Sequence, residues 1–215
     1  MPDIDVAQLF IAFAVLLFSL TVHESAHAWT ADRLGDPTAR LLGRVSLNPA
    51  MHADPIGTIL FPLVAMVSGA PLIGWAKPVP VSPWRLRHPR RDYVLVAAAG
   101  PASNLAMAFA AALTVALLPI SPRGIGGSGV SASVARIPSE LIQLNLLLAV
   151  FNMIPIPPLD GGNVLAGLLP PRLAMPFNRM RPYGFLLLYA LILTGGFDYL
   201  VVPPYRFLLS WLPSR

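Results

Sequence analysis

The sequence contains no cysteine and very little charge. Without cysteine, the chain can form no disulfide bond and can offer no thiolate to a metal ion. Only 12% of its 215 residues are charged, about half the share found in soluble domains, and the mean hydropathy is +0.66. Glutamate occurs only at positions 24 and 140. We therefore expect an integral membrane protein in which few side chains are available for polar chemistry.

The basic residues lie in loops between apolar runs and give the chain a net charge of +5. This distribution is typical of membrane topology, and no basic patch is interleaved with aromatic residues as in nucleic-acid-binding proteins. We therefore expect the lipid bilayer, and not a nucleic acid, as a partner. Asp3 and Asp5 stand where a cleavable signal peptide would be basic, so no such peptide is expected.

Long uncharged runs organise the chain. They cover residues 6–22, 55–76, 93–122, 141–159 and 182–197. A membrane-spanning helix needs about 20 apolar residues, so the sequence predicts an all-α polytopic membrane protein with about four to six transmembrane or re-entrant helices. The run 55–76 is rich in proline and glycine, and we predict that it is re-entrant.

Two basic loops, at residues 77–91 and 172–181, predict the orientation of the chain. Positively charged loops tend to remain in the cytoplasm, so the first run is expected to enter from outside and the Gly/Ser-rich segment 121–133 to lie outside. The run from residue 141 then returns inward and ends at the depth of the first run's inner end. We expect one membrane-embedded domain over residues 1–215, with a core at about 9–169 and a helical extension at about 170–215.

Two short segments resemble extended strands. Residues 42–47 are a candidate short strand, and residues 75–81 contain Pro78 and Pro80, which bias the residues before them toward extended geometry. We predict that the two segments form a short β-hairpin-like element near the active site.

At the end of the first apolar run stands His23-Glu24-Ser25-Ala26-His27, an H-E-x-x-H motif. Residues four apart lie on one face of a helix, so His23 and His27 can direct two imidazoles at one metal ion. Glu24 stands beside them, where it can accept a proton from an activated water molecule. Three such residues in this arrangement indicate a metal-dependent hydrolase.

A hydrolytic metal site usually has three protein ligands. The other glutamate, Glu140, is expected at the outer end of an inward-running helix, so the remaining candidates are Asp160, Asp54, His52 and His88. Asp160 stands out because it follows a proline-rich apolar segment and precedes two glycines. A carboxylate in such surroundings needs a partner.

Together these segments resemble the site-2 protease family of intramembrane zinc metalloproteases. The resemblance rests on the H-E-x-x-H motif, on Asn152…Leu159-Asp160-Gly161, which is similar to the family's N-x-x-P-x-P-x-x-L-D-G signature, and on Gly100-Pro101-Ala102-Ser103-Asn104. It covers residues from about 9 to 169. The sequence leaves no room for a PDZ insert or a C-terminal regulatory domain, so we expect a compact member of the family. We expect it in a prokaryotic cell membrane, and the basic loops predict that its active site lies toward the cytoplasm.

The resemblance also implies roles for single residues. It implies one Zn²⁺ per chain, bound by the two histidines and Asp160, with Glu24 as general base. Asn152 and Asn104 match positions that orient the substrate or stabilise the oxyanion. The expected substrate is the transmembrane segment of another protein, hydrolysed in or near the membrane.

More modest interpretations stay open. Close helix packing through Gly100 and Ser103 accounts equally well for the segment that contains Asn104, and Asn152 can serve as a hydrogen bonder at a helix end or between helices. Asp54 followed by Pro55 is typical of a helix N-terminus, with Asp54 as the capping residue. For the whole protein, the alternative is a non-catalytic membrane-protein binder or chaperone with the protease fold, although Glu24 has little purpose without hydrolysis. A transporter would require internal repeats, which the sequence lacks.

Overall fold

A computed structural model describes residues 6–68, 75–117 and 136–212, and the regular secondary structure within these ranges is helical. The predicted outer segment 121–133 and the acidic residues at positions 3 and 5 fall outside the described residues. The longer helices are α1 (Val6–Arg33), α3 (Phe61–Ser68), α4 (Pro89–Leu117), α6 (Ile137–Asn152), α7 (Asp160–Leu168), α8 (Pro171–Arg179), α9 (Gly184–Leu193) and α10 (Gly196–Trp211).

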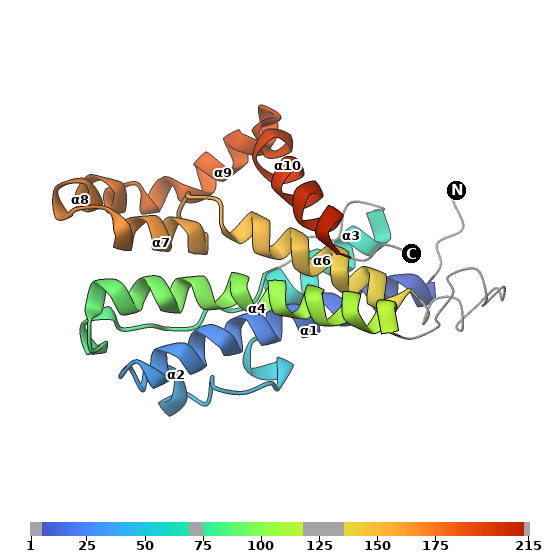
Figure 1. Cartoon of the computed structure of the whole chain (residues 1–215), viewed down its shortest axis with the longest axis horizontal. Coiled ribbons are helices and arrows are strands. Elements are labelled where there is room, and N and C mark those ends of the chain that lie inside the picture. The colour runs from blue at the N-terminus through green and yellow to red at the C-terminus, as the bar shows by residue number, and fades with distance from the viewer. Residues whose placement is uncertain (1–5, 69–74, 118–135, 213–215) are drawn as a thin grey trace.

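Helix α4 is the centre of the arrangement. It packs against α1, α6 and α7, while α10 packs against the outer side of α6 (Figure 1). Small side chains make this close packing possible, since Ala108, Ala111 and Ala112 of α4 are buried against Ile142 and Leu146 of α6. The H-E-x-x-H motif on α1 and the start of α7 therefore lie beside the same segment of α4.

Among the described residues, two helices, α1 and α4, are long and apolar enough to cross a membrane, and a third span results if the pair 181–193 and 196–211, bent by 82°, counts as one. This number is lower than the predicted four to six. Helix α6 has only 16 residues, about 24 Å at 1.5 Å per residue. It ends where the prolines after residue 154 remove backbone donors, so it falls short of a full bilayer.

The run predicted to be re-entrant begins with a π-helical turn over Pro55–Leu60 and continues as α3. Asp54 caps this turn by accepting hydrogen bonds from the N–H groups of Ile56 and Gly57, which confirms the capping interpretation. After residues 69–74, which are not described, Trp75 donates its N–H to the carbonyl oxygen of Gly57. The two ends of the segment therefore meet, as a re-entrant element requires.

The prediction of a β-hairpin-like element was wrong, because the described residues contain no strand. Residues 75–81 are extended, but their N–H groups bond elsewhere: Lys77 donates to the carbonyl of His52 and Val79 to the Glu24 side chain. Pro78 and Pro80 have no N–H to donate. The other segment, 42–47, begins with a turn at Gly43, where φ is +69°, and it forms no ladder with the first.

Candidate metal centre

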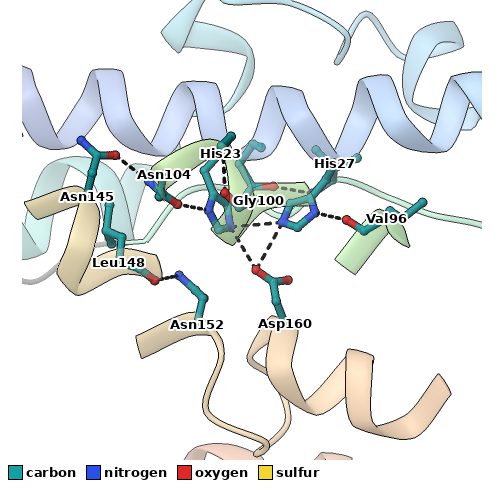
Figure 2. Close-up of polar contacts among 12 residues, drawn as sticks. His23, His27, Val96, Gly100, Asn104, Asn145, Leu148, Asn152 and Asp160 are labelled. Carbon is teal, nitrogen blue, oxygen red and sulfur yellow. Dashed lines mark hydrogen bonds and ion pairs between the residues drawn. The ribbon is translucent and has the colours of Figure 1, made fainter. Parts of the chain in front are cut away.

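Three side chains from two distant parts of the sequence meet beside α4 (Figure 2). His23 and His27 lie one turn apart on α1, and Asp160 is the first residue of α7. Each offers one ligand atom, and these atoms lie within 4.8 Å of one another. The two Nε2 atoms are 3.1 Å apart, and they lie 3.1 Å and 3.3 Å from Oδ2 of Asp160.

The protonation of His27 follows from its second partner. Its Nδ1 lies 2.7 Å from the backbone carbonyl oxygen of Val96, on α4. A carbonyl oxygen can only accept, so Nδ1 carries the hydrogen and Nε2 of the neutral ring presents a lone pair.

The protonation of His23 is determined by a longer chain of hydrogen bonds. Asn145 Nδ2 donates to the carbonyl oxygen of Leu141, which fixes its amide orientation, and its Oδ1 accepts from Nδ2 of Asn104. Asn104 Oδ1 therefore faces Nδ1 of His23, at 2.5 Å. Nδ1 is the donor in that bond, and Nε2 of His23 also presents a lone pair to the centre.

When both rings are neutral, as metal ligation requires, the cluster consists of three acceptor atoms with no donor between them. Oδ2 of Asp160 is buried and forms no hydrogen bond within the described chain, and three acceptors held this close repel one another unless a cation lies between them. Tetrahedral zinc with bonds of about 2.0 Å places its ligand atoms about 3.3 Å apart. The observed spacings of 3.1–3.3 Å fit such an ion.

Gly100 provides the space in which the imidazoles sit. A Cβ atom at this position would lie 2.6 Å from Cε1 and Nε2 of His23, and closer still to Nε2 of His27. Any side chain at residue 100 would therefore occupy the position of the histidine nitrogens. The alternative interpretation of Gly100, close helix packing, holds as well, because the same missing Cβ lets α1 approach α4.

The loop between α6 and α7 positions Asp160. It contains Pro155, Pro157 and Pro158, which prevent α6 from continuing. The loop then folds back so tightly that a Cβ on Gly162 would lie 2.6 Å from the backbone nitrogen of Pro157, and Gly161 is packed as closely against Met153. The two glycines allow α7 to begin directly under the histidines.

Glu24 lies beside the cluster without belonging to it. It lines a cavity of about 290 Å³ together with both histidines and Asp160. Its Oε2 accepts a hydrogen bond of 3.0 Å from the N–H of Val79, in the extended segment. A carboxylate that is no ligand but faces the same cavity is suited to proton transfer.

The two predicted asparagines lie in different places. Asn152 lines the cavity and donates through Nδ2 to the carbonyl oxygen of Leu148. Asn104 is fully buried behind His23 and is not among the cavity-lining residues. From this position Asn104 can orient the imidazole of His23 but does not face the cavity.

The other ligand candidates lie away from the cluster. Nε2 of His52 contacts the carbonyl oxygen of Ser46 and Oγ of Ser25. His88 is exposed beside Asp92, Asp54 caps the π-helical turn, and Glu140 lies in the first turn of α6.

The sequence interpretation missed several groups that hold the site in place. Asn145 and the carbonyl of Val96 fix the two imidazoles, and the N–H of Val79 fixes Glu24. The positions of backbone groups cannot be read from a sequence. Asn145 could have been found, because a side-chain amide in an apolar helix requires a hydrogen-bond partner.

Sequence similarity relates the chain to known proteins. The family model described as Peptidase family M50 matches residues 11–134 and 120–195. A protein of Bacillus subtilis (strain 168), named "Putative zinc metalloprotease YwhC", is 39% identical over 188 residues, which are 87% of this chain and 82% of that protein. "Putative zinc metalloprotease Rip2" of Mycobacterium tuberculosis (strain H37Rv) is 32% identical over 178 residues, 82% of this chain and 64% of that protein. No solved structure matches the chain.

These matches identify the class of protein that the fold and the site define. The chain belongs to peptidase family M50, the site-2 protease family, as its motifs predict. It is a membrane protein of a zinc metalloprotease family, and zinc is the metal that its three-residue cluster fits.

Proposed function

We propose that the protein is a zinc-dependent intramembrane endopeptidase, which hydrolyses peptide bonds in or near the transmembrane segments of other membrane proteins. The convergence of His23, His27 and Asp160 on one point carries this proposal, because with neutral imidazoles their lone pairs meet at a point that a cation would fit. Glu24 in the same cavity supports hydrolysis over simple metal binding.

One Zn²⁺ per chain would be bound by His23, His27 and Asp160. Zinc in such a site acts as a Lewis acid that polarises a carbonyl and makes water more acidic. Glu24 would accept a proton from the attacking water and pass it to the leaving amine. Asn152 lines the cavity at the end of α6 and would donate its second N–H to the carbonyl oxygen as negative charge develops there.

The position of the site supports cleavage at membrane depth. His23 and His27 lie in the second half of α1, one of the helices long and apolar enough to span a bilayer. The basic loops at residues 77–91 and 172–181 flank this end of the molecule, so we place the site toward the cytoplasm. We treat residues 1–215 as one membrane-embedded domain.

A transmembrane substrate would have to unwind before hydrolysis. Helical hydrogen bonds shield its peptide groups, and in an apolar medium each released group needs a new partner. The cavity of about 290 Å³ admits a short extended segment and not a whole helix. The polar groups that line it would replace the hydrogen bonds of the unwound segment.

The alternative is a non-catalytic binder that keeps the fold. Glu24 distinguishes the two functions, because a protease needs it as a general base and a binder does not. The test compares the wild type with Glu24→Gln on a labelled synthetic transmembrane peptide in detergent micelles. Glu140→Gln, at the other glutamate, is the matched control. We expect cleavage by the wild type and by Glu140→Gln, and none by Glu24→Gln. Equal rates for the wild type and Glu24→Gln would refute the protease.

A further inference from the structure

The side chain of Asn163 is not used by the proposed mechanism, yet it lines the same cavity as the metal ligands. It lies on α7, three residues after Asp160, so the two side chains share one face of that helix. The Asn163 amide therefore lies at the edge of the space that a bound substrate would enter.

Two donors determine the orientation of this amide. Oδ1 of Asn163 accepts from the hydroxyl group of Tyr93 at 3.1 Å and from Nη2 of Arg181 at 2.8 Å. A guanidinium group can only donate, so the atom that faces it is the carbonyl oxygen and not the nitrogen. Both lone pairs of Oδ1 are occupied. Nδ2, at the other end of the amide, finds no acceptor among the residues that the structure describes.

Several of the other donors that line the cavity are engaged, at least in part. Val79 donates its N–H to Glu24, and Asn152 uses one of its two side-chain N–H groups on Leu148. Pro78 and Pro158 have no N–H. An unwound peptide, in contrast, arrives with several carbonyl oxygens that have lost their helical donors. The two hydrogens on Nδ2 of Asn163 match that need.

We propose that Asn163 is a substrate-binding residue whose Nδ2 donates to a backbone carbonyl of the substrate next to the scissile peptide. Arg181 and Tyr93 are positioning residues that hold its amide in this orientation. The cationic Arg181 also polarises the amide, which strengthens its N–H donors. Arg181 belongs to the basic segment after α8, so the C-terminal part of the chain contributes to substrate binding through this contact.

This inference rests on the proposed function, and its test separates the two. Binding of the labelled transmembrane peptide is measured in the Glu24→Gln background, where nothing is cleaved. In this background Asn163→Ala removes one donor to a neutral acceptor, and we expect peptide affinity to fall about three- to tenfold. Thermal unfolding and zinc content are measured for each variant, and binding is repeated after zinc removal.

Asn163→Asp distinguishes substrate binding from a structural role. An aspartate keeps the acceptor that Tyr93 and Arg181 require, but presents a second acceptor where the substrate needs a donor. We expect affinity to fall at least as far as with Asn163→Ala, with thermal stability retained. If Asn163→Asp binds the peptide as well as Asn163 does, with or without zinc, the inference is wrong even where the wild type cleaves. A wild type that binds but does not cleave overturns only the protease function.

Discussion

Nδ1 of His23 on α1 lies 2.5 Å from Oδ1 of Asn104 on α4, and both residues are buried. This contact determines which nitrogen of the imidazole carries the hydrogen, and hence that Nε2 faces Asp160 with a lone pair. Asn104 itself is oriented by Asn145 on α6. Three helices therefore determine the state of one ligand, which ties metal binding to the packing of the bundle.

Removing Asn104 should weaken the metal site without touching a ligand. In Asn104→Ala, His23 loses the acceptor that fixes its tautomer, and Oδ1 of Asn145 loses its donor. Loss of such an orienting partner typically costs 10- to 100-fold in metal affinity, and we expect a loss in that range by competition with a chelator. Ser103→Ala is the control, because Ser103 Oγ bonds only the Gly100 carbonyl in its own helix. Equal zinc affinity in both variants would contradict the role of Asn104.

Gly100→Ala should abolish zinc binding while the helix is preserved or strengthened. The new Cβ would stand where the Nε2 atoms lie, whereas alanine favours a helix by about 1 kcal/mol over glycine. Zinc content is measured on the purified protein, and helicity by circular dichroism. A Gly100→Ala protein that keeps its zinc would show that the two imidazoles do not lie against residue 100.

Val79→Pro should impair catalysis and spare zinc. Proline removes the N–H that holds Oε2 of Glu24, and Glu24 is no ligand. We expect kcat to fall by about tenfold, the worth of a hydrogen bond to a charged group of about 1.5 kcal/mol, at unchanged zinc content. Val79→Ala keeps the N–H and is the control. If both variants are equally active, the Val79 hydrogen bond has no role in catalysis.

Asp36 should matter more for stability than the nearby Asp32. Asp36 is fully buried in the loop after α1 and accepts hydrogen bonds from the backbone N–H groups of Thr38 and Ser82. Asp32 forms a surface ion pair with the exposed Arg40. We expect Asp36→Ala to cost about 2–4 kcal/mol and Asp32→Ala less than about 1 kcal/mol.

Thermal unfolding in one detergent compares the two aspartate variants. A smaller shift for Asp36→Ala than for Asp32→Ala would mean that the segment around Ser82 is not anchored through Asp36.

The site could be predicted from the sequence where its geometry is local. The i, i+4 spacing of His23 and His27 predicts that both lie on one face of a helix. Asp54 before Pro55 predicts the N-cap of a helical turn. The approach of Asp160 rested on topology and on the family signature, and the structure brings it to the histidines. The resemblance to the family was confirmed by the comparisons.

Other features depend on long-range packing that no local pattern encodes. The segment 75–81 looks like a strand because its prolines favour extended geometry. Its donors, however, bond a helical turn and Glu24, so it pairs with no strand. The number of spanning helices was overestimated, because uncharged runs were counted and the prolines that end α6 shorten one of them. Asn104 was assigned to the substrate and lies instead behind His23.

The measurement that tests this account most directly is the zinc content of purified Asp160→Ala beside that of Glu24→Gln. If Asp160 is the third ligand and Glu24 the base, Glu24→Gln retains about one zinc per chain and Asp160→Ala loses most of it. An Asp160→Ala protein with one zinc per chain and wild-type cleavage would contradict the assignment of the metal centre.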